Sequence, residues 1–373
     1  MVWLMIIKDE LYGTMDFNHT EASIIDTPAF QCLRRIKQMS FTNLVYPGAN
    51  HTRFEHSLGT SHLSGLIAEK VDLDNDAVNK VRLYGLLHDI GHIAFSHEGE
   101  EVLSKYLGTH EEIGKKIITE GEIADILTEN YNPREIAELG KRKEGRIVYS
   151  DLGADRMDYL RRDAQNTGVA YGVIDTDRIV HTLAMHNGEL IIEEGGLTAA
   201  ESLLIARFMM FTAVYLHRTV RIATSMLHKA IENSIADRTL QASQFLTMGD
   251  EDAMMAMCSS PTARSYVIGL KERKLYKEIF AVNARKMNNK TAEDKRASLS
   301  KKINAEVLMS YQQQLYKKVD FNVLTGRGLV QIAELSELVN KLEKGEEGRH
   351  EVLFMCASEF REQIKKHLGN EKL

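Results

Sequence analysis

The richest group of chemically active side chains lies between residues 86 and 97. His88 and Asp89 follow an apolar run, and His92 and His97 come next along the chain. An imidazole and a carboxylate together bind hard or borderline divalent cations. Adjacent helical positions lie about 100° apart, so both groups can reach one ion beyond a helix end. The alternative is a pair of polar residues that cap a helix, and these two residues alone leave both interpretations open.

Histidine is concentrated around this stretch. Seven of the fourteen histidines lie between His51 and His110, and His92 shares a helix face with His88. This concentration favours a functional site over a helix cap. A metal site needs more than two ligands, so the others must come from elsewhere in the chain.

A second group of candidates lies between residues 150 and 168. Asp155, Tyr159 and Asp163 recur every four residues and therefore share one face of a predicted helix. Two carboxylates and a phenol on one stripe are typical of a functional site. The alternation of Asp and Arg is equally typical of surface ion pairs, which contribute little to stability.

The elements that must position these residues are predicted to be mostly helical, because prolines number only four and good helix formers are abundant. Thr27 and Pro28 predict the start of a helix over residues 28–38. A helix resumes at Arg53, and Asp74 or Asn75 caps the helix that leads to His88.

Strands with turns are predicted for residues 1–13 and 190–196, and one long apolar helix for residues 198–235. We predict a core over residues 1–237 and a mostly helical accessory region over residues 238–373.

Composition restricts the class of protein. The net charge of −6 argues against broad, sequence-independent binding to nucleic acid. Cys32, Cys258 and Cys356 are few and far apart, which indicates buried thiols in a reducing compartment. The apolar run over residues 2–7 is too short for a signal-peptide core or a membrane span. We therefore expect a cytoplasmic protein without membrane contact.

Several motifs, in this order, resemble the HD-domain metal phosphohydrolases, and more narrowly their deoxynucleoside triphosphate triphosphohydrolase (dGTPase-like) branch. The likeness extends from about residue 8 to about residue 281 and is strongest before residue 170. The matching segments are IDTPAFQ (25–31), RRIKQ (34–38), YPGANHTRFEHSLG (46–59), LLHDIGHIAFSH (86–97), THE (109–111) and DRMDYLRRD (155–163).

The resemblance implies a mainly α fold, an HD-domain helical core with small β-hairpin elements. It implies one divalent ion per subunit (Mn, Mg, Fe, Ni or Zn), held by His56, His88, Asp89 and Asp155. It also implies hydrolysis of deoxynucleoside triphosphates (dNTPs) at the α-phosphorus, giving a deoxynucleoside and inorganic triphosphate. A divalent ion suits this reaction because it lowers the pKa of a bound water and polarises a phosphoryl oxygen.

By the same resemblance, other side chains surround the phosphates. His97 is the better candidate for general acid, because a histidine with a pKa near neutrality can protonate the leaving oxygen. Arginines there neutralise phosphate charge. The residues expected at the phosphates are His92, His97, Arg53 and Arg156. Glu100 and His110 are expected to orient an imidazole or to relay a proton to it.

The resemblance further implies a nucleoside pocket. Asp163 would accept a hydrogen bond from the 3′-hydroxyl, and an apolar floor at Met39 would disfavour a 2′-hydroxyl, so we expect dNTPs to be preferred over NTPs. Arg221 stands where the vertebrate member of the branch has an aromatic residue. The residues expected to bind the nucleoside are Gln38, Met39, Tyr159, Asp163, Arg218 and Arg221.

Asp26, Gln31 and Arg34 match positions that, in the family, read the guanine of an activating nucleotide between subunits. A carboxylate can accept from N1–H and N2, and arginine can donate to O6 or N7. The alternative is a surface network of residues three apart around a helix start. The resemblance thus predicts a homo-oligomer, a dimer or tetramer, activated by a guanine nucleotide.

Two other functions are considered. One is another HD-type reaction, by a nucleotidase or phosphodiesterase, which the released product would distinguish. The other is a nucleotide sensor without turnover. All four expected ligands and the nearby histidines are present, so nothing in the sequence favours an inactive site.

Overall fold

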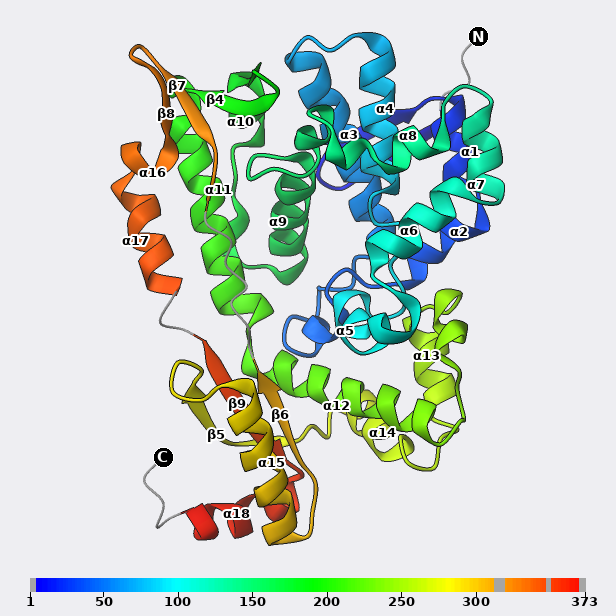
Figure 1. The fold of residues 1–373 in the computed structure, drawn as a ribbon, viewed down its shortest axis with the longest axis vertical. Helices are drawn as coiled ribbons and strands as arrows, with labels where there is room; N and C mark the ends of the chain where they lie inside the picture. The colour runs from blue at the N-terminus through cyan, green and yellow to red at the C-terminus, as the bar shows by residue number, and fades with distance from the viewer. Residues whose placement is uncertain (1–4, 312–318, 347–349, 369–373) are drawn as a thin grey trace.

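The computed structural model describes residues 5–311, 319–346 and 350–368. Over these residues the fold is mainly α-helical with three small sheets, which confirms the predicted class. Helices from the first part of the chain form the upper body, and the sheet of residues 277–283, 307–311 and 351–356 lies at the opposite end of the molecule (Figure 1).

The chain begins with an antiparallel hairpin of β1 (Met5–Asp9) and β2 (Gly13–Phe17); residues 1–4 of the predicted strand lie outside the described residues. After α1 (His19–Ile25), helix α2 (Pro28–Cys32) starts as predicted, with the Thr27 side chain accepting from the Phe30 N–H.

The predicted extent of this helix, to residue 38, is wrong. Helix α2 gives way to a 3-10 turn, η1 (Leu33–Arg35). The reason is pairing with the segment before α3: Ile36 O accepts from Arg53 N, and Gln38 N donates to His51 O.

Three helices form the centre of the upper body: α3 (Arg53–Lys70), α4 (Asn75–Leu87) and α9 (Ala154–Thr167). Helix α3 begins with a capping box of Thr52 and Glu55, and Asp74 caps α4 as predicted. Apolar residues from these helices share one core cluster, including Leu63, Val81, Met157 and Leu160. This packing fixes the helix ends that carry the candidate residues.

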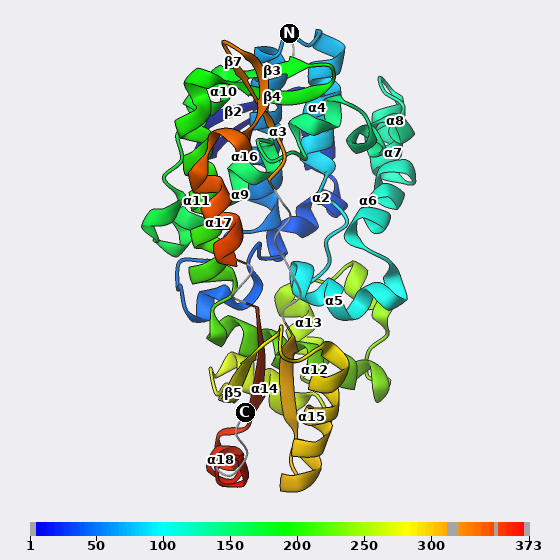
Figure 2. The same cartoon turned by 60° about the vertical axis from the view of Figure 1, so that its left-hand side comes forward.

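Helices α6, α7 and α8 lie along one edge of the upper body (Figure 2). Several shorter elements, these three included, surround the central helices. They are η2 (Ser40–Leu44), α5 (Ser96–Leu107), α6 (His110–Thr119), α7 (Glu122–Thr128), α8 (Pro133–Ala137), η3 (Leu139–Lys141), η4 (Glu144–Ile147), η5 (Ala170–Gly172), α10 (Thr176–Thr182) and η6 (Glu194–Gly196).

The single long helix predicted for residues 198–235 is wrong. Helix α11 (Leu197–Met210) runs into a π-helical turn, η7 (Phe211–Tyr215), and α12 (Arg218–Ala236) starts afresh. The His217 side chain accepts from the Thr219 N–H and caps the new helix. Helix α11 descends from the upper body, and α12 begins beside the sheet of residues 277–283, 307–311 and 351–356 and runs away from it (Figure 1).

By length and composition, residues Glu194–Tyr215 form a helix that could cross a membrane, and 44 % of its most apolar window is buried. Leu203, Leu204 and Met210 belong to the same core cluster as the central helices. Packing inside this fold therefore accounts for the apolar character of the segment.

The C-terminal part contains strands as well as helices. Strand β4 (Glu189–Glu193), which pairs with β3 (Leu183–His186), also pairs in parallel with β7 (Asn322–Thr325). The chain thus returns to the upper body after residue 237, and the division at that residue stays a prediction.

A separate sheet has the order β5-β9-β6. The remaining elements are η8 (Ala242–Leu246), α13 (Asp250–Met257), α14 (Arg264–Lys271), β5 (Lys277–Asn283), α15 (Asn289–Ile303), β6 (Val307–Tyr311), β8 (Gly328–Gln331), α16 (Ile332–Leu335), α17 (Glu337–Glu346), β9 (Glu351–Cys356), η9 (Ser358–Phe360) and α18 (Arg361–Leu368).

Candidate active site

Three helices bring the predicted metal ligands to one point. His56 lies in the first turn of α3, His88 and Asp89 follow the last residue of α4, and Asp155 lies in the first turn of α9. His56 Nε2 is 3.2 Å from Asp155 Oδ1 and 3.6 Å from Asp89 Oδ2, and His88 Nε2 is 3.4 Å from Asp89 Oδ1. Donor atoms of His56, His88 and Asp155 all lie within 4.8 Å of one another. This spacing suits a single ion.

The other ring nitrogens of both histidines already have partners. His88 Nδ1 is 2.7 Å from the Gly85 carbonyl oxygen, and His56 Nδ1 is 2.7 Å from Asp158 Oδ2. Such contacts leave Nε2 for a cation. Among the described residues, His88 Nε2 is buried without a hydrogen-bond partner, which is costly unless it binds something. The mixed nitrogen and oxygen donors therefore fit a divalent cation.

Opposing effects set the charges at this point. Burial raises the pKa of the Asp155 carboxyl, but the neighbouring imidazoles of His56 and His88 bring it below its ordinary value. Burial lowers the pKa of His56, but hydrogen bonds to Asp155 and Asp158 raise it to about 10. Without a cation His56 is protonated, so cation binding must release that proton.

Arg53 adds a buried positive charge beside the expected ligands. Its Nη1 donates to Asp89 Oδ2 at 2.6 Å, its Nε donates to Ser96 Oγ at 3.0 Å, and the residue is 3 % exposed. Arg156 pairs with Asp151, whose second oxygen accepts from the Asp320 N–H. Both predicted phosphate-binding arginines thus already have carboxylate partners.

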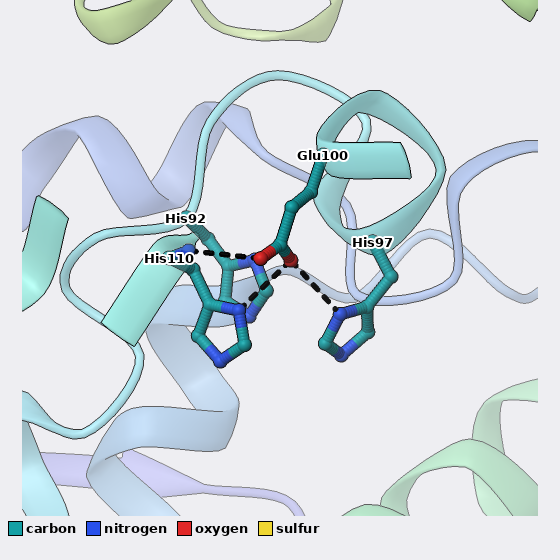
Figure 3. A group of neighbouring side chains, drawn as sticks. All are labelled: His92, His97, Glu100 and His110. Carbon is teal, nitrogen blue, oxygen red and sulfur yellow. Dashed lines mark hydrogen bonds and ion pairs between the residues drawn. The ribbon is translucent and has the colours of Figure 1, made fainter. Parts of the chain in front are cut away.

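A second group consists of His92, His97, Glu100 and His110 (Figure 3). Glu100 Oε2 is 2.8 Å from His110 Nδ1 and 3.4 Å from His97 Nδ1. The rings of His92 and His110 stack with their centroids 4.2 Å apart. His92 Nε2 is 3.4 Å from Asp89 Oδ1, so the second group adjoins the first.

The imidazoles of this group differ in charge. Burial, followed by the charge of Arg53, places the pKa of His92 well below its ordinary value, so this ring is neutral at about pH 7. Burial also opposes protonation of His110, but the hydrogen bond to Glu100 raises its pKa. The His97 side chain is 64 % exposed, so it is the ring most open to an incoming group.

The backbone before α5, which carries His97 and Glu100, is strained. Phe95 and Ser96 have φ angles of 68° and 56°, in the left-handed region that costs non-glycine residues energy. Asp250 of α13 accepts from the Phe95 N–H at 2.7 Å and from the Lys37 N–H at 3.0 Å. Sequence reasoning missed Asp250, because a carboxylate in a first helical turn is usually an ordinary cap.

Asp163 on α9 lies in a network that sequence reasoning also missed. His51 Nε2 is 2.7 Å from its Oδ1, and the Tyr215 hydroxyl donates to its Oδ2 at 2.7 Å. Both carboxylate oxygens thus have partners, and a sugar hydroxyl must share or replace them. His51 lies within the matching motif of residues 46–59, and this position could have identified it as a site residue.

The remaining predicted nucleoside residues lie near this face. Tyr159 is one helical turn from Asp155 and from Asp163, and burial raises its pKa. Gln38 Oε1 is buried without a partner among the described residues, and Met39 is 5 % exposed. The role of these residues stays a prediction.

Arg218 and Arg221 face the C-terminal sheet. Arg218 pairs with Glu278 and Glu351, and Arg221 donates to the backbone oxygens of Ser310 and Glu351. Their partners lie on β5, β6 and β9. Among the described residues, neither arginine shows a contact with a residue of the two histidine groups.

The predicted guanine-reading residues lie on the first helices. Arg34 Nε donates to Gln31 Oε1 at 2.9 Å, and Gln31 Nε2 donates to Ile25 O at 2.8 Å. Asp26 is exposed at the end of α1. The contact between residues three apart, Gln31 and Arg34, is therefore present. The nucleotide-binding role of these residues stays a prediction.

A model of the HD domain matches residues 53–211, and a model of an HD associated region matches residues 174–371. The chain belongs to the HD-domain phosphohydrolase family.

Three similar proteins illustrate this family. An uncharacterized protein of Methanocaldococcus jannaschii, MJ1154, is 42 % identical over 66 % of this chain and 53 % of its own length. A Dictyostelium discoideum protein named deoxynucleoside triphosphate triphosphohydrolase SAMHD1 homolog is 30 % identical over 66 % of this chain and 51 % of its own length. A crystal structure of a hypothetical protein from Aquifex aeolicus has a TM-score of 0.84, with 30 % identity over 98 % of this chain and all of that one.

This HD-domain chain therefore spans about half the length of these two curated relatives. The family is shown by sequence and fold together.

Proposed function

We propose that this protein is a metal-dependent triphosphohydrolase that converts dNTPs into deoxynucleosides and inorganic triphosphate. The contact between the two groups, His92 Nε2 at 3.4 Å from Asp89 Oδ1, carries the proposal. It places imidazoles that can transfer a proton directly beside the expected ligands His56, His88, Asp89 and Asp155. When bound, the ion lowers the pKa of water and polarises a phosphoryl oxygen.

Arginines offset the charge of the triphosphate. Arg53 lies against Asp89 with its guanidinium buried, where charge-assisted hydrogen bonds to phosphate oxygens are strong. Arg156 follows Asp155 on α9, and its pairing with Asp151 opens or is shared when a phosphate approaches. Arg218 and Arg221 reach a nucleotide only by exchanging their present partners.

His97 acts as the general acid for the leaving 5′-oxygen. Its Nδ1 faces Glu100 and the ring is largely exposed, so Nε2 is the nitrogen available to a substrate. Glu100 orients the ring, and His110, with its raised pKa, holds a proton on the other side of the same carboxylate. His92, neutral and buried, accepts or donates at the phosphates without adding charge.

The α9 face selects the sugar. Asp163 accepts from a 3′-hydroxyl, Tyr159 packs beside it, and Gln38 supplies a buried oxygen that has no partner among the described residues. Met39 forms an apolar floor against which a 2′-hydroxyl would lose its hydration. The protein should prefer dNTPs over NTPs.

A guanine nucleotide activates the enzyme by favouring a homo-oligomer, a dimer or tetramer, in the cytoplasm. Asp26 is exposed and the Gln31–Arg34 pair offers both an acceptor and donors, which suits the edge of a guanine. A nucleotide that binds only the assembled form shifts the equilibrium towards assembly.

The test is a product assay. Protein stripped of metal is reloaded separately with Mn, Mg, Fe, Ni or Zn and given each dNTP and NTP, singly and mixed, and the products are resolved by ion exchange. We expect deoxynucleoside and triphosphate. Monophosphate and pyrophosphate would indicate another HD-type reaction, and metal binding without turnover would indicate a sensor; either result contradicts the proposal.

A further inference from the structure

Arg162 of α9 is among the largest fully buried side chains of the described residues. Its Nε and Nη2 donate to the two oxygens of Asp158 at 3.0 Å and 2.9 Å, and its Nη1 donates to Asp9 Oδ2 at 2.9 Å. Both carboxylates are also buried. Removal of one partner from such a group leaves an uncompensated buried charge. A substitution at any of the three residues therefore disturbs the other two.

The same Asp158 reaches a predicted metal ligand. Its Oδ2 lies 2.7 Å from His56 Nδ1, while His56 Nε2 faces Asp89 and Asp155. A carboxylate that holds the far nitrogen of a histidine fixes the ring and makes it a better ligand. Asp9, Arg162, Asp158 and His56 therefore form one continuous chain of buried contacts, called here the Asp9–His56 chain.

Gly59 on α3 provides the room for this chain. A Cβ at this position would collide with Asp158 Oδ1 and Arg162 Nη2. Only glycine leaves space for both groups, so the sequence of α3 is adapted to the chain as well as to the ligand His56 one turn earlier.

Asp9 joins the chain to the β1–β2 hairpin, and its two oxygens have separate partners. Oδ1 accepts from the N–H groups of Leu11 and Tyr12 at 2.8 Å and 3.1 Å and shapes the turn of the hairpin. Oδ2 accepts from Arg162. An Asp9→Asn variant keeps the Oδ1 bonds and places an amide donor against the Arg162 donor, so it perturbs the chain and spares the turn.

We propose that Asp9 and Arg162 are positioning residues of the metal centre, which fix Asp158 so that His56 presents Nε2 to the cation. This inference rests on the metal centre of the proposed function. It makes the attachment of the hairpin to α9 a determinant of cation affinity, although no hairpin residue is an expected ligand.

A buried ion pair elsewhere provides a matched control. Glu21 is 0 % exposed, and its Oε1 accepts from Arg82 Nε at 2.7 Å, which joins α1 to α4. The contacts that the structure shows for this pair, among the described residues, include none of the four expected ligands. Glu21→Gln therefore weakens a comparable pair without touching the Asp9–His56 chain.

The experiment measures Mn²⁺ affinity of metal-stripped full-length protein by calorimetry, and the visible spectrum of the Co²⁺-loaded protein at saturation. Asp9→Asn should lower Mn²⁺ affinity by roughly 10–100-fold and shift the Co²⁺ bands, because the ring of His56 is no longer fixed. Asp158→Asn tests the same chain from its other end, and Asp9→Glu, which restores a carboxylate, should regain affinity. Glu21→Gln should bind both ions like the wild type.

Wild-type affinity in the folded Asp9→Asn and Asp158→Asn variants would overturn the inference, as would an equal loss in Glu21→Gln. If Asp9→Asn loses affinity in a protein that hydrolyses no dNTP, the positioning role stands and the proposed reaction falls. If Asp9→Asn binds normally in an active enzyme, only the positioning role falls. A wild-type protein that binds no divalent ion would overturn both.

Discussion

Asp250 links the C-terminal part of the chain to the histidine groups. Its contribution to the free energy of unfolding depends on pH. Its carboxylate is 6 % exposed and accepts from the N–H groups of Lys37 and Phe95. Burial raises its pKa from 3.8 to about 6, against the opposing effect of these hydrogen bonds. The folded protein therefore holds this proton more tightly than the unfolded chain, and stability falls as the pH rises from about 4 to about 6.

The size of the effect follows from the pKa. A tenfold change in an equilibrium constant corresponds to about 1.4 kcal/mol, so a pKa raised from 3.8 to about 6 places a cost on the order of 3 kcal/mol on the ionised, folded state. Below about pH 3 the carboxyl is protonated in both states and this cost vanishes. Asp250→Asn removes the titration and keeps one oxygen acceptor. The unfolding free energy of the wild type relative to Asp250→Asn should therefore fall by about 3 kcal/mol between about pH 3 and about pH 7.

Urea unfolding followed by circular dichroism at several pH values measures this difference. All other titrating groups are common to both proteins and cancel. Asp252→Asn is the control, because Asp252 lies on the same helix with its side chain 48 % exposed, and this variant should keep the pH trend of the wild type. A difference between wild type and Asp250→Asn that stays constant across the range would refute the reasoning.

Three further predictions concern the site. Asp155→Ala should lose metal and activity together, measured by elemental analysis and product assay; full metal content would show that Asp155 is no ligand. His97→Ala should lower turnover by roughly 10²–10⁴-fold with metal affinity preserved, and equal losses in both would exclude a general acid. Arg34→Ala should abolish, together, the rise in oligomer fraction and in dNTP turnover on addition of GTP or dGTP; an unchanged response to GTP would remove Arg34 from regulation.

Local patterns were enough to predict the helix starts around the site. Thr27 and Asp74 cap their helices with side chains that accept from N–H groups three residues on, and such signals need no tertiary information. The grouping of His88 with Asp89 after an apolar helix was equally visible. That His56 and Asp155 join them came from the family resemblance, because spacing alone does not bring separate helices together.

The break before α12 was not visible in the sequence. The apolar pattern continues through residues 211–216, and neither glycine nor proline marks the end of the helix there. The π-helical turn ends at Tyr215, whose hydroxyl bonds Asp163 of α9, so the break coincides with a contact between segments far apart in the chain.

Buried charges were also beyond sequence reasoning. Asp158 and Arg162 are four residues apart, a spacing equally typical of a surface ion pair. The second carboxylate that pairs with Arg162 comes from Asp9, near the start of the chain. Asp250 resembles any acidic residue in a first helical turn. In each case the partner that gives the residue its role lies more than one hundred residues away.

In the proposed reaction, water attacks the α-phosphorus and the bond to the 5′-oxygen breaks. Hydrolysis of a dNTP in oxygen-18 water by the metal-loaded protein, with mass analysis of both products, tests this most directly. We predict one oxygen-18 atom in the inorganic triphosphate and an unlabelled deoxynucleoside. Label in the deoxynucleoside, or release of a deoxynucleoside monophosphate with pyrophosphate, would contradict it.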